Sequence, residues 1–194
     1  MGRQQDAAYY DGIYLGSHYE QEASALRWYP IWKEVADTLI KQGATKIIDL
    51  GCGPGHLAEV IAHTTGYPIK YIGYDFSGIA IDMSTKKSLD DRFSFVKVDL
   101  SNYDFNKFID ENDNLFYVSI EFFEHVEFDQ EVIKRMKPNK PLIFSLPKFD
   151  DPGHVRFFEN EQSIITRYED LLDIHEIKLM QDKWRFLIRS TVKE

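Results

Sequence analysis

The sequence has 194 residues, 43% of them hydrophobic, and a formal net charge of −9 at pH 7. This length and hydrophobic share are typical of one domain with a sizeable core. The negative charge disfavours nucleic acid as a partner, because binding to its backbone relies on Lys and Arg. The single cysteine, Cys52, excludes an intrachain disulfide and a cysteine-based zinc site. Without an apolar signal core or a membrane-length apolar run, we expect a cytoplasmic protein with no membrane partner.

The first predicted long helix covers residues 30–42. Ile31, Val35 and Leu39 repeat at helical spacing, and Gly43 provides a helix end. The segment before this helix is rich in Tyr and Trp but has no clean helical stripe. We therefore expect one domain over residues 1–194, composed of an N-terminal helical segment, 1–43, and a core, 44–194.

Five short apolar segments follow, and each has the length of a β-strand. They are "TKIIDL", "IKYIGYD", "FSFVKVDL", "NLFYVSI" and "PLIFSLP". Several are apolar at successive positions, which is typical of strands buried on both faces of a parallel sheet. Helical spacing recurs after the first strand and near the C-terminus, at Leu57, Val60, Ile61 and Thr64 and at Ile164, Ile165, Tyr168, Leu171 and Leu172. Ser77 and Asn102 stand where helix N-caps would follow a strand.

The strand ends repeat at a regular interval. Asp49, Asp75, Asp99, Glu121 and Ser145 are 26, 24, 22 and 24 residues apart, about the length of a strand, a helix and two loops. Right-handed crossovers then predict an α/β, doubly wound sheet, with a ligand beyond the carboxyl ends of its strands. The segments "HEIKLM" and "WRFLIRSTV" predict a closing antiparallel hairpin, so the sheet is mostly parallel and seven-stranded.

The stretch "LGCGPGH" joins the first strand to a helix and contains Gly51, Gly53 and Gly55. Glycine permits positive φ and close approach of a ligand to the backbone. The third glycine of the dinucleotide-binding pattern is missing, because His56 follows Gly55. This loop therefore predicts a ligand other than a dinucleotide.

Five motifs follow one another within about residues 46–190: "IIDLGCGPG", "YIGYDFS", "FVKVDLS", "YVSIEFFEHV" and "RMKPNKPLIFSLP". In this order they resemble the class I methyltransferases that use S-adenosylmethionine, and imply a Rossmann-like methyltransferase fold. The sequence departs from the family at "KPNKP", where many relatives have a Gly-Gly turn. This departure concerns a loop and leaves the implied cofactor unchanged.

The resemblance implies cofactor contacts at Asp49, Gly51, Gly53, Gly55, Asp75, Phe76, Asp99, Leu100 and Ile120. The glycine backbone would approach the amino-acid part of the cofactor, and Asp49 would orient the loop or accept from the ammonium. Asp75 would accept from both ribose hydroxyls, because a carboxylate has two acceptor oxygens. Phe76 would cover the adenine, Asp99 would receive its amino group beside the Leu100 amide, and Ile120 would lie near the sulfonium.

The second chemical cluster is "EFFEHVEF", which contains Glu121, Glu124 and His125, and His154 follows the fifth strand. Three interpretations remain open: packing, a general base at His125 or His154 with Glu121 beside the substrate, and a metal site. The arrangement of Glu121, Glu124 and His125, with another His downstream, is similar to the metal-binding set of small-RNA 2′-O-methyltransferases and ubiquinone-pathway O-methyltransferases. We expect no metal, and a histidine base for an oxygen or nitrogen acceptor.

Relatives often use the segment before the first strand as a lid, and this resemblance implies substrate contacts at Tyr14, His18 and Tyr19. We expect methyl transfer from S-adenosylmethionine to a small molecule, with oxygen as acceptor and S-adenosylhomocysteine as product. The alternatives are a non-catalytic cofactor-binding partner subunit, a metal-assisted O-methyltransferase using Glu121, Glu124 and His125, and a related transferase such as an aminopropyl transferase.

Overall fold

A computed structural model describes residues 2–16, 18–64, 68–107, 109–110 and 113–194. The helices are α1 (Ala7–Leu15), α2 (Tyr29–Lys41), α3 (His56–Thr64), α4 (Gly78–Lys86), α5 (Asp129–Lys134) and α6 (Glu161–Tyr168), with short 3-10 turns at His18–Glu20 and Ala23–Ala25. The strands are β1 (Lys46–Leu50), β2 (Lys70–Asp75), β3 (Phe93–Lys97), β4 (Leu115–Ser119), β5 (Pro141–Pro147), β6 (Leu172–Leu179) and β7 (Arg185–Val192).

The described strands form one sheet in the order β3-β2-β1-β4-β5-β7-β6. Strands β1 to β5 are parallel, and β7 runs antiparallel to both β5 and β6. The chain order reverses between β1 and β4, which places the switch point of this doubly wound sheet there. The predicted α/β, mostly parallel, seven-stranded sheet with its C-terminal antiparallel hairpin is confirmed.

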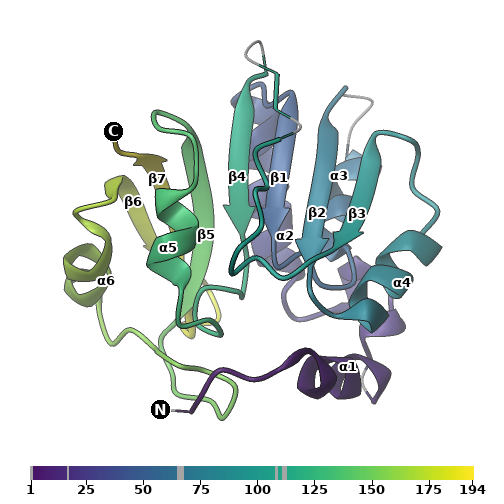
Figure 1. Ribbon diagram of the computed structural model, residues 1–194, viewed down its shortest axis with the longest axis horizontal. Coiled ribbons are helices and arrows are strands. Elements are labelled where there is room, and N and C mark those ends of the chain that lie inside the picture. Colours follow the sequence, from purple (N-terminus) through teal and green to yellow (C-terminus); the bar gives the residue numbers. More distant parts are fainter. Residues whose placement is uncertain (1, 17, 65–67, 108, 111–112) are drawn as a thin grey trace.

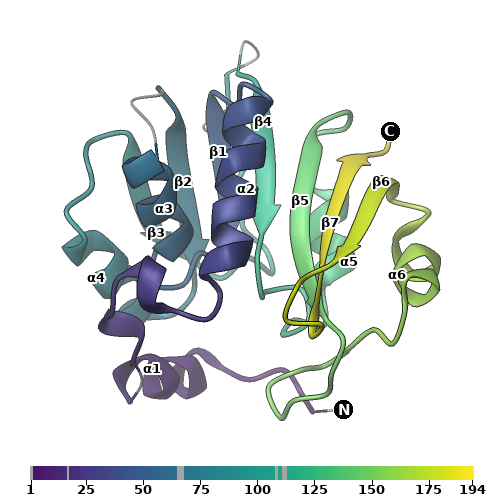
Figure 2. The same ribbon diagram turned by 180° about the vertical axis from the view of Figure 1, so that it is seen from behind.

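Helices cover both faces of the sheet. Helices α2 and α3 lie on one face, and α5 lies on the other, as the two opposite views show (Figures 1 and 2). Every residue of β1 is buried, which explains its run of apolar residues. Ile47 belongs to the core cluster beneath α2 and α3, whereas Ile48 and Leu50 belong to the cluster on the opposite face.

Local signals explain several helix boundaries. The Ser77 hydroxyl accepts from the Ala80 amide at 3.0 Å, so the predicted N-cap of the second crossover helix is confirmed. The N-cap prediction at Asn102 is wrong. Residues 98–107, 109–110 and 113–114 contain no helix, because Asp99 and Asp104 each accept backbone amides two residues ahead and form turns instead.

The last predicted helix is shorter than the apolar spacing suggested. Helix α6 ends at Tyr168, and Leu172 already begins β6. Strand β6 also begins earlier than the predicted "HEIKLM" and has an irregularity in its register between Ile174 and Glu176. Pairing with β7 therefore overrides the helical spacing of Leu171 and Leu172.

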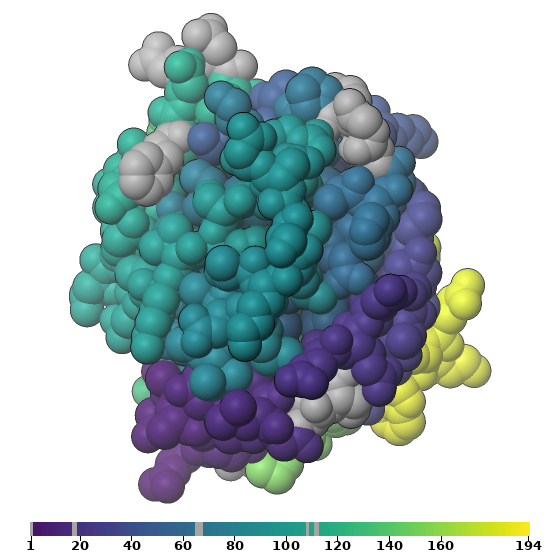
Figure 3. All heavy atoms as spheres, turned by 90° about the vertical axis from the view of Figure 1, so that its right-hand side faces the viewer, coloured from purple at the N-terminus to yellow at the C-terminus, as the bar shows by residue number. Residues whose placement is uncertain are grey.

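Helix α1 lies across the carboxyl ends of the parallel strands, away from both sheet faces (Figure 1). Its N-cap is Asp6, whose side chain accepts from the Tyr9 amide at 3.0 Å. Asp11 of the same helix accepts from the Ser77 hydroxyl at 2.5 Å and from the Ile79 amide at 3.3 Å. In the space-filling view the N-terminal segment covers the lower edge of the molecule (Figure 3).

Candidate functional site

Two adjoining cavities lie at the carboxyl ends of the parallel strands. The larger has a volume of about 1210 Å³ and the smaller about 330 Å³. Five residues line both of them, namely Tyr10, Tyr14, Gly51, Glu121 and His125. The larger cavity contains Asp75, Phe76, Asp99 and Leu100, and the smaller contains Asp49, Gly53, Ile120, Tyr19 and His154. The tertiary structure therefore brings together Asp49, Asp75, Asp99 and Glu121 from four strand ends, whereas Ser145 of β5 is not among the described lining residues.

The glycine loop has the backbone conformation that its sequence predicts. Gly51 has a φ of +75°, and a Cβ there would lie 2.6 Å from the Phe122 ring. Gly55 has a φ of +76°, and its Cβ would lie 2.9 Å from Ser84 Cβ and 3.1 Å from the Phe95 ring. Among the described lining residues, Gly55 belongs to neither cavity. The structure thus gives Gly55 a role in packing α3 against α4 and β3, whereas Gly51 and Gly53 face the cavities.

Asp75 is buried at the end of β2 and joins the glycine loop to α4. Its Oδ2 accepts from the Gly53 amide at 2.9 Å, and its Oδ1 accepts from the Ser77 amide at 2.8 Å. Burial raises the pKa of Asp75 to about 6, and the amide bonds oppose that rise. Each carboxylate oxygen keeps a further acceptor position for a donor in the cavity.

Asp49 lies at the end of β1 and lines the smaller cavity. It accepts a hydrogen bond from the Tyr71 hydroxyl of β2. Burial raises the pKa of Asp49 to about 7, against the opposing effect of the Tyr71 bond. A cationic group in the smaller cavity would therefore stabilise the carboxylate.

The far end of the larger cavity is formed by the segment after β3. The Asp99 carboxylate is exposed and accepts from the Ser101 amide at 2.8 Å. The Leu100 carbonyl accepts from Arg135 at 2.5 Å, which fixes the backbone beside the cavity. Phe76 lies with its ring centroid 5.5 Å from that of Tyr10 on α1, so α1 closes one wall.

Glu121 follows β4 and has a φ of +57°, a strained conformation for a residue other than glycine. Its Oε1 accepts from the Ser145 hydroxyl at 3.0 Å, and its Oε2 lies 2.9 Å from Arg185 Nε. The Ser145 hydroxyl also accepts from the Glu121 amide at 2.8 Å. Both carboxylate oxygens therefore have partners, and Glu121 is not grouped with Glu124 and His125 as the metal alternative requires.

Glu124, His125 and His154 form a separate cluster. The two imidazole rings are 5.0 Å apart between centroids, and Glu124 is fully buried. One ligand atom of each residue lies within 4.8 Å of the others. Burial raises the pKa of Glu124 well above its ordinary value and lowers the pKa of His125. The histidines from two distant segments, both predicted candidates, are thus neighbours.

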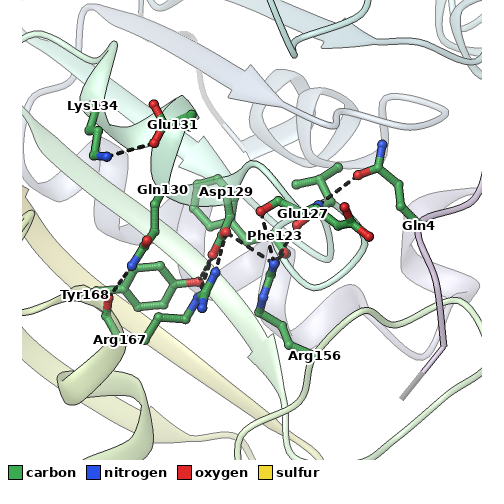
Figure 4. A network of polar contacts seen from close by, with 11 residues as sticks. Gln4, Phe123, Glu127, Asp129, Gln130, Glu131, Lys134, Arg156, Arg167 and Tyr168 are labelled. Atoms are coloured by element: carbon green, nitrogen blue, oxygen red, sulfur yellow. Dashed lines mark hydrogen bonds and ion pairs between the residues drawn. The ribbon is translucent and has the colours of Figure 1, made fainter.

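A polar network holds the loop that carries this cluster (Figure 4). Arg156 donates to the carbonyl oxygens of Phe123 and Val126, the latter at 2.5 Å. The buried Asp129 carboxylate contacts Arg156 at 3.3 Å, Arg167 at 2.6 Å and the Tyr168 hydroxyl at 2.7 Å. Three segments distant in sequence therefore fix the backbone on both sides of Glu124 and His125.

Aromatic and cationic side chains complete the smaller cavity, and the sequence did not single out Trp28 or Arg185 among them. Tyr19 stacks on Trp28 with centroids 5.4 Å apart, and Arg185 lies 5.8 Å from the Trp28 centroid. The density of Tyr and Trp before β1 was the available signal for Trp28 and for Tyr10. Of the predicted substrate residues, Tyr14 and Tyr19 line the cavity. The prediction for the His18 side chain lies outside the described residues.

Residues 41–184 match the family described as "Methyltransferase domain". The chain belongs to the methyltransferase domain family. This match covers more than half of the sequence, including the glycine loop and the Glu124 cluster. The predicted identification as a class I S-adenosylmethionine-dependent methyltransferase is confirmed. Among curated proteins, no sequence is significantly similar to this methyltransferase.

Solved structures share the fold at low sequence identity. The N-methyltransferase NodS from Bradyrhizobium japonicum WM9, in complex with S-adenosyl-L-homocysteine, is 17% identical, with a TM-score of 0.67 over 98% of this chain and 100% of that chain. A putative methyltransferase complexed with the Haloferax volcanii Trm112 methyltransferase activator is 15% identical, with a TM-score of 0.68 over 100% of both chains.

Magnesium protoporphyrin IX methyltransferase from Synechocystis PCC 6803, with bound S-adenosylhomocysteine, is 15% identical, with a TM-score of 0.63 over 85% of this chain and 83% of that chain. These likenesses confirm the Rossmann-like fold of the methyltransferase. None of the helices among its described residues combines the length and apolar character that a membrane crossing requires.

Proposed function

We propose that this methyltransferase binds S-adenosylmethionine across both cavities and transfers its methyl group to a small-molecule acceptor, with oxygen as the acceptor atom. The observation that carries the proposal is the junction of the cavities beside Gly51, with Asp75 on one side and Asp49 on the other. A cofactor that has a neutral nucleoside and a zwitterionic amino acid matches this separation of the two acids.

The nucleoside lies in the larger cavity in this proposal. The remaining acceptor positions of the Asp75 carboxylate receive the two ribose hydroxyls, and the Phe76 ring, which contacts Tyr10, covers the adenine space. Asp99 and the Leu100 backbone lie at the far end of this cavity, where the adenine edge needs hydrogen-bonding groups. A 2′-phosphate beside Asp75 is disfavoured by like-charge repulsion.

The amino-acid end lies in the smaller cavity, against Gly51 and Gly53. Asp49 compensates the charge of the ammonium group, which in turn lowers the cost of ionising this buried carboxylate. The sulfonium then lies near the junction, beside Ile120 and Glu121. Arg185 and Ser145 bind both carboxylate oxygens of Glu121, so we assign Glu121 a positioning role and no role as acid or base.

The acceptor occupies the rest of the smaller cavity, and helix α1 is its lid. The stacked rings of Tyr19 and Trp28 offer a flat apolar wall, which favours a compact acceptor with a planar part. His125 and His154 lie beside it and act on the acceptor hydroxyl. Helix α1 covers the site and excludes water from the reactive sulfonium, and its Asp11 contact with Ser77 supports such a lid.

The chemical step is an in-line displacement. The acceptor oxygen forms a bond to the methyl carbon, and the bond from that carbon to sulfur breaks. The imidazole of His125 or His154 takes the proton of the acceptor hydroxyl. The product is S-adenosylhomocysteine. Because the thioether is a good leaving group, orientation of the acceptor is the main contribution, worth roughly 7–11 kcal/mol.

The test combines cofactor binding with turnover. Calorimetry with S-adenosylmethionine, S-adenosylhomocysteine and NAD is expected to show binding of the first two alone. A panel of small planar hydroxyl compounds is then incubated with methyl-labelled cofactor, and a labelled product is expected. Binding without transfer to any compound would favour the partner-subunit alternative, and transfer of an aminopropyl group from decarboxylated cofactor would favour the other transferase.

A further inference from the structure

The Glu124 carboxylate is an unpaired acid in the interior of the protein. Its side chain is 0% exposed, and neither oxygen has a hydrogen-bond partner among the described residues. Burial raises the pKa of Glu124 and two arginines oppose that rise, but both arginines bind other groups. Arg156 binds backbone carbonyls and Asp129, and Arg185 binds Glu121 and Asp182. A buried carboxylate in such a place needs a proton or a cation.

Two imidazoles beside Glu124 are held in one tautomer by backbone carbonyls. His125 Nδ1 lies 2.9 Å from the Gly153 oxygen, and His154 Nδ1 lies 3.2 Å from the Phe149 oxygen. A carbonyl oxygen only accepts, so each Nδ1 carries a hydrogen, and Nε2 is the ring nitrogen left to bind a ligand. Metal-binding histidines are commonly fixed in this way, with the other ring nitrogen donating to a carbonyl.

We propose that Glu124, His125 and His154 form a binding site for one divalent transition-metal ion. One ligand atom from each residue already lies within 4.8 Å of the other two. A tetrahedral ion with bonds of about 2.0–2.1 Å holds its ligands roughly 3.4 Å apart, so closure requires movements of about an ångström. The Arg156 contacts fix the backbone of the loop, which leaves this movement to side-chain rotation.

The donor set decides which ion fits. Two imidazoles and one carboxylate suit Zn²⁺, Fe²⁺ or Co²⁺, whereas Mg²⁺ and Ca²⁺ favour oxygen ligands. This trio differs from the sequence-based alternative, because His154 takes the place of Glu121, whose oxygens are bound by Arg185 and Ser145. The site also differs from our expectation that the chain holds no metal.

Three protein ligands leave a coordination position open. His125 and His154 line the smaller cavity, so that position is on the side assigned to the acceptor. An acceptor oxygen bound to such an ion would lose its proton more readily than in water, and with the ion bound the proton would pass to solvent, because both histidine Nε2 atoms would be ligands. The use of the ion on the acceptor rests on the proposed function, whereas ion binding itself does not.

The experiment measures metal binding without any methyl acceptor. Tag-free protein is stripped with chelator and titrated with Co²⁺, whose visible absorption reports coordination number and ligand type. We expect one equivalent to bind, and Zn²⁺ to displace it and raise the Tm, while excess Mg²⁺ does neither. Glu124→Gln and His154→Asn are each expected to weaken Co²⁺ binding by about 100-fold or more, since even outer partners of metal ligands contribute 10–100-fold.

The matched control is His63→Asn on the exposed end of α3, which should leave Co²⁺ binding unchanged. Circular dichroism and S-adenosylhomocysteine binding, both measured without metal, verify that each variant is folded. If Glu124→Gln does not fold, His154→Asn carries the test. Absence of Co²⁺ binding by folded wild-type protein, or equal binding by His154→Asn, would overturn the site. Loss of the metal site with intact cofactor binding leaves the proposed function standing.

Discussion

Arg185 of β7 reaches past β5 to Glu121 after β4, with Nε 2.9 Å from Oε2. The Arg185 side chain is 5% exposed and that of Glu121 is 23% exposed. The pair connects the antiparallel end of the sheet to the loop that follows its switch point. Because Glu121 lines both cavities, the geometry of their junction depends on a residue more than sixty positions later in the chain.

The first prediction concerns this ion pair. Arg185→Gln should lower the free energy of unfolding by about 2–3 kcal/mol, because it leaves a partly buried carboxylate without its partner. Urea unfolding of the single variants and of Arg185→Gln with Glu121→Gln gives the coupling energy. Lys33→Gln is the matched control, since its exposed pair with Asp37 should cost at most about 0.5 kcal/mol. A coupling energy near zero would show that the Arg185 contact does not hold Glu121.

The second prediction concerns the proposed ribose contact. Asp75→Asn keeps the shape of the side chain but leaves one acceptor oxygen, so S-adenosylhomocysteine binding should weaken by about 1.5–3 kcal/mol, or roughly 10- to 100-fold in Kd. Calorimetry measures this Kd, and Asp82→Asn, on the exposed side of α4, serves as control. An unchanged Kd in folded Asp75→Asn would reduce Asp75 to its structural bonds with Gly53 and Ser77.

The third prediction is a pH dependence of stability. Burial raises the pKa of Asp49 to about 7 in the folded state, above the unfolded value of about 3.9. Between these values the folded protein binds more protons, so stability present at low pH is lost as pH rises through about 4 to 7. The side chain at this position in Asp49→Asn would stay neutral throughout. The free energy of unfolding of this variant, relative to that of the wild type, should therefore rise by on the order of 1–3 kcal/mol between pH 5 and pH 8.

Thermal unfolding of cofactor-free protein between pH 5 and pH 8 measures this difference. The exposed Asp82→Asn should follow the wild-type curve throughout. Parallel curves for wild type and Asp49→Asn would contradict the assignment of the titrating group to Asp49.

The fourth prediction separates the roles of Gly53 and Gly55 in the loop. Gly55→Ala should destabilise the fold by about 1–3 kcal/mol, since its Cβ would meet Ser84 and Phe95 at positive φ. Gly53 also has a positive φ, of +52°, but its Cβ would meet only the Tyr14 hydroxyl, at 3.3 Å, so the larger effect of Gly53→Ala should be on cofactor affinity. Denaturant unfolding and calorimetry on both variants test the division, and equal loss of affinity in folded Gly55→Ala would contradict it.

The fifth prediction concerns the lid. Asp11→Ala removes the contact of α1 with the Ser77 cap, while the cap bond from Ala80 remains. We expect faster cleavage of the N-terminal segment by a protease and a rise of about threefold to tenfold in the Kd of S-adenosylhomocysteine, because a typical hydrogen bond contributes about 0.5–1.5 kcal/mol and only part of the loss of α1 docking affects the cofactor. An unchanged protease pattern and an unchanged Kd in folded Asp11→Ala would contradict the lid.

Local patterns in the sequence determined much of this protein. The buried runs of β1, β4 and β5, the 22- to 26-residue spacing and the glycine loop predicted the sheet and its ligand edge, because strand burial and tight turns depend on nearby residues. After β3 the sequence predicted a helix capped at Asn102, and the structure has turns. Asp99 and Asp104 accept hydrogen bonds from backbone amides that a helix would otherwise use.

The tertiary structure alone decided which side chains meet. The sequence placed His154 at the same edge of the sheet as His125, but nothing in the spacing of Glu121, Glu124 and His125 showed that Arg185 and Ser145 would engage Glu121 and so separate it from the other two. Such pairings depend on the crossing of the chain between β5 and β7 and on the loop held by Arg156. They are set by long-range packing, and the residues they join are too far apart in sequence to show a periodic pattern.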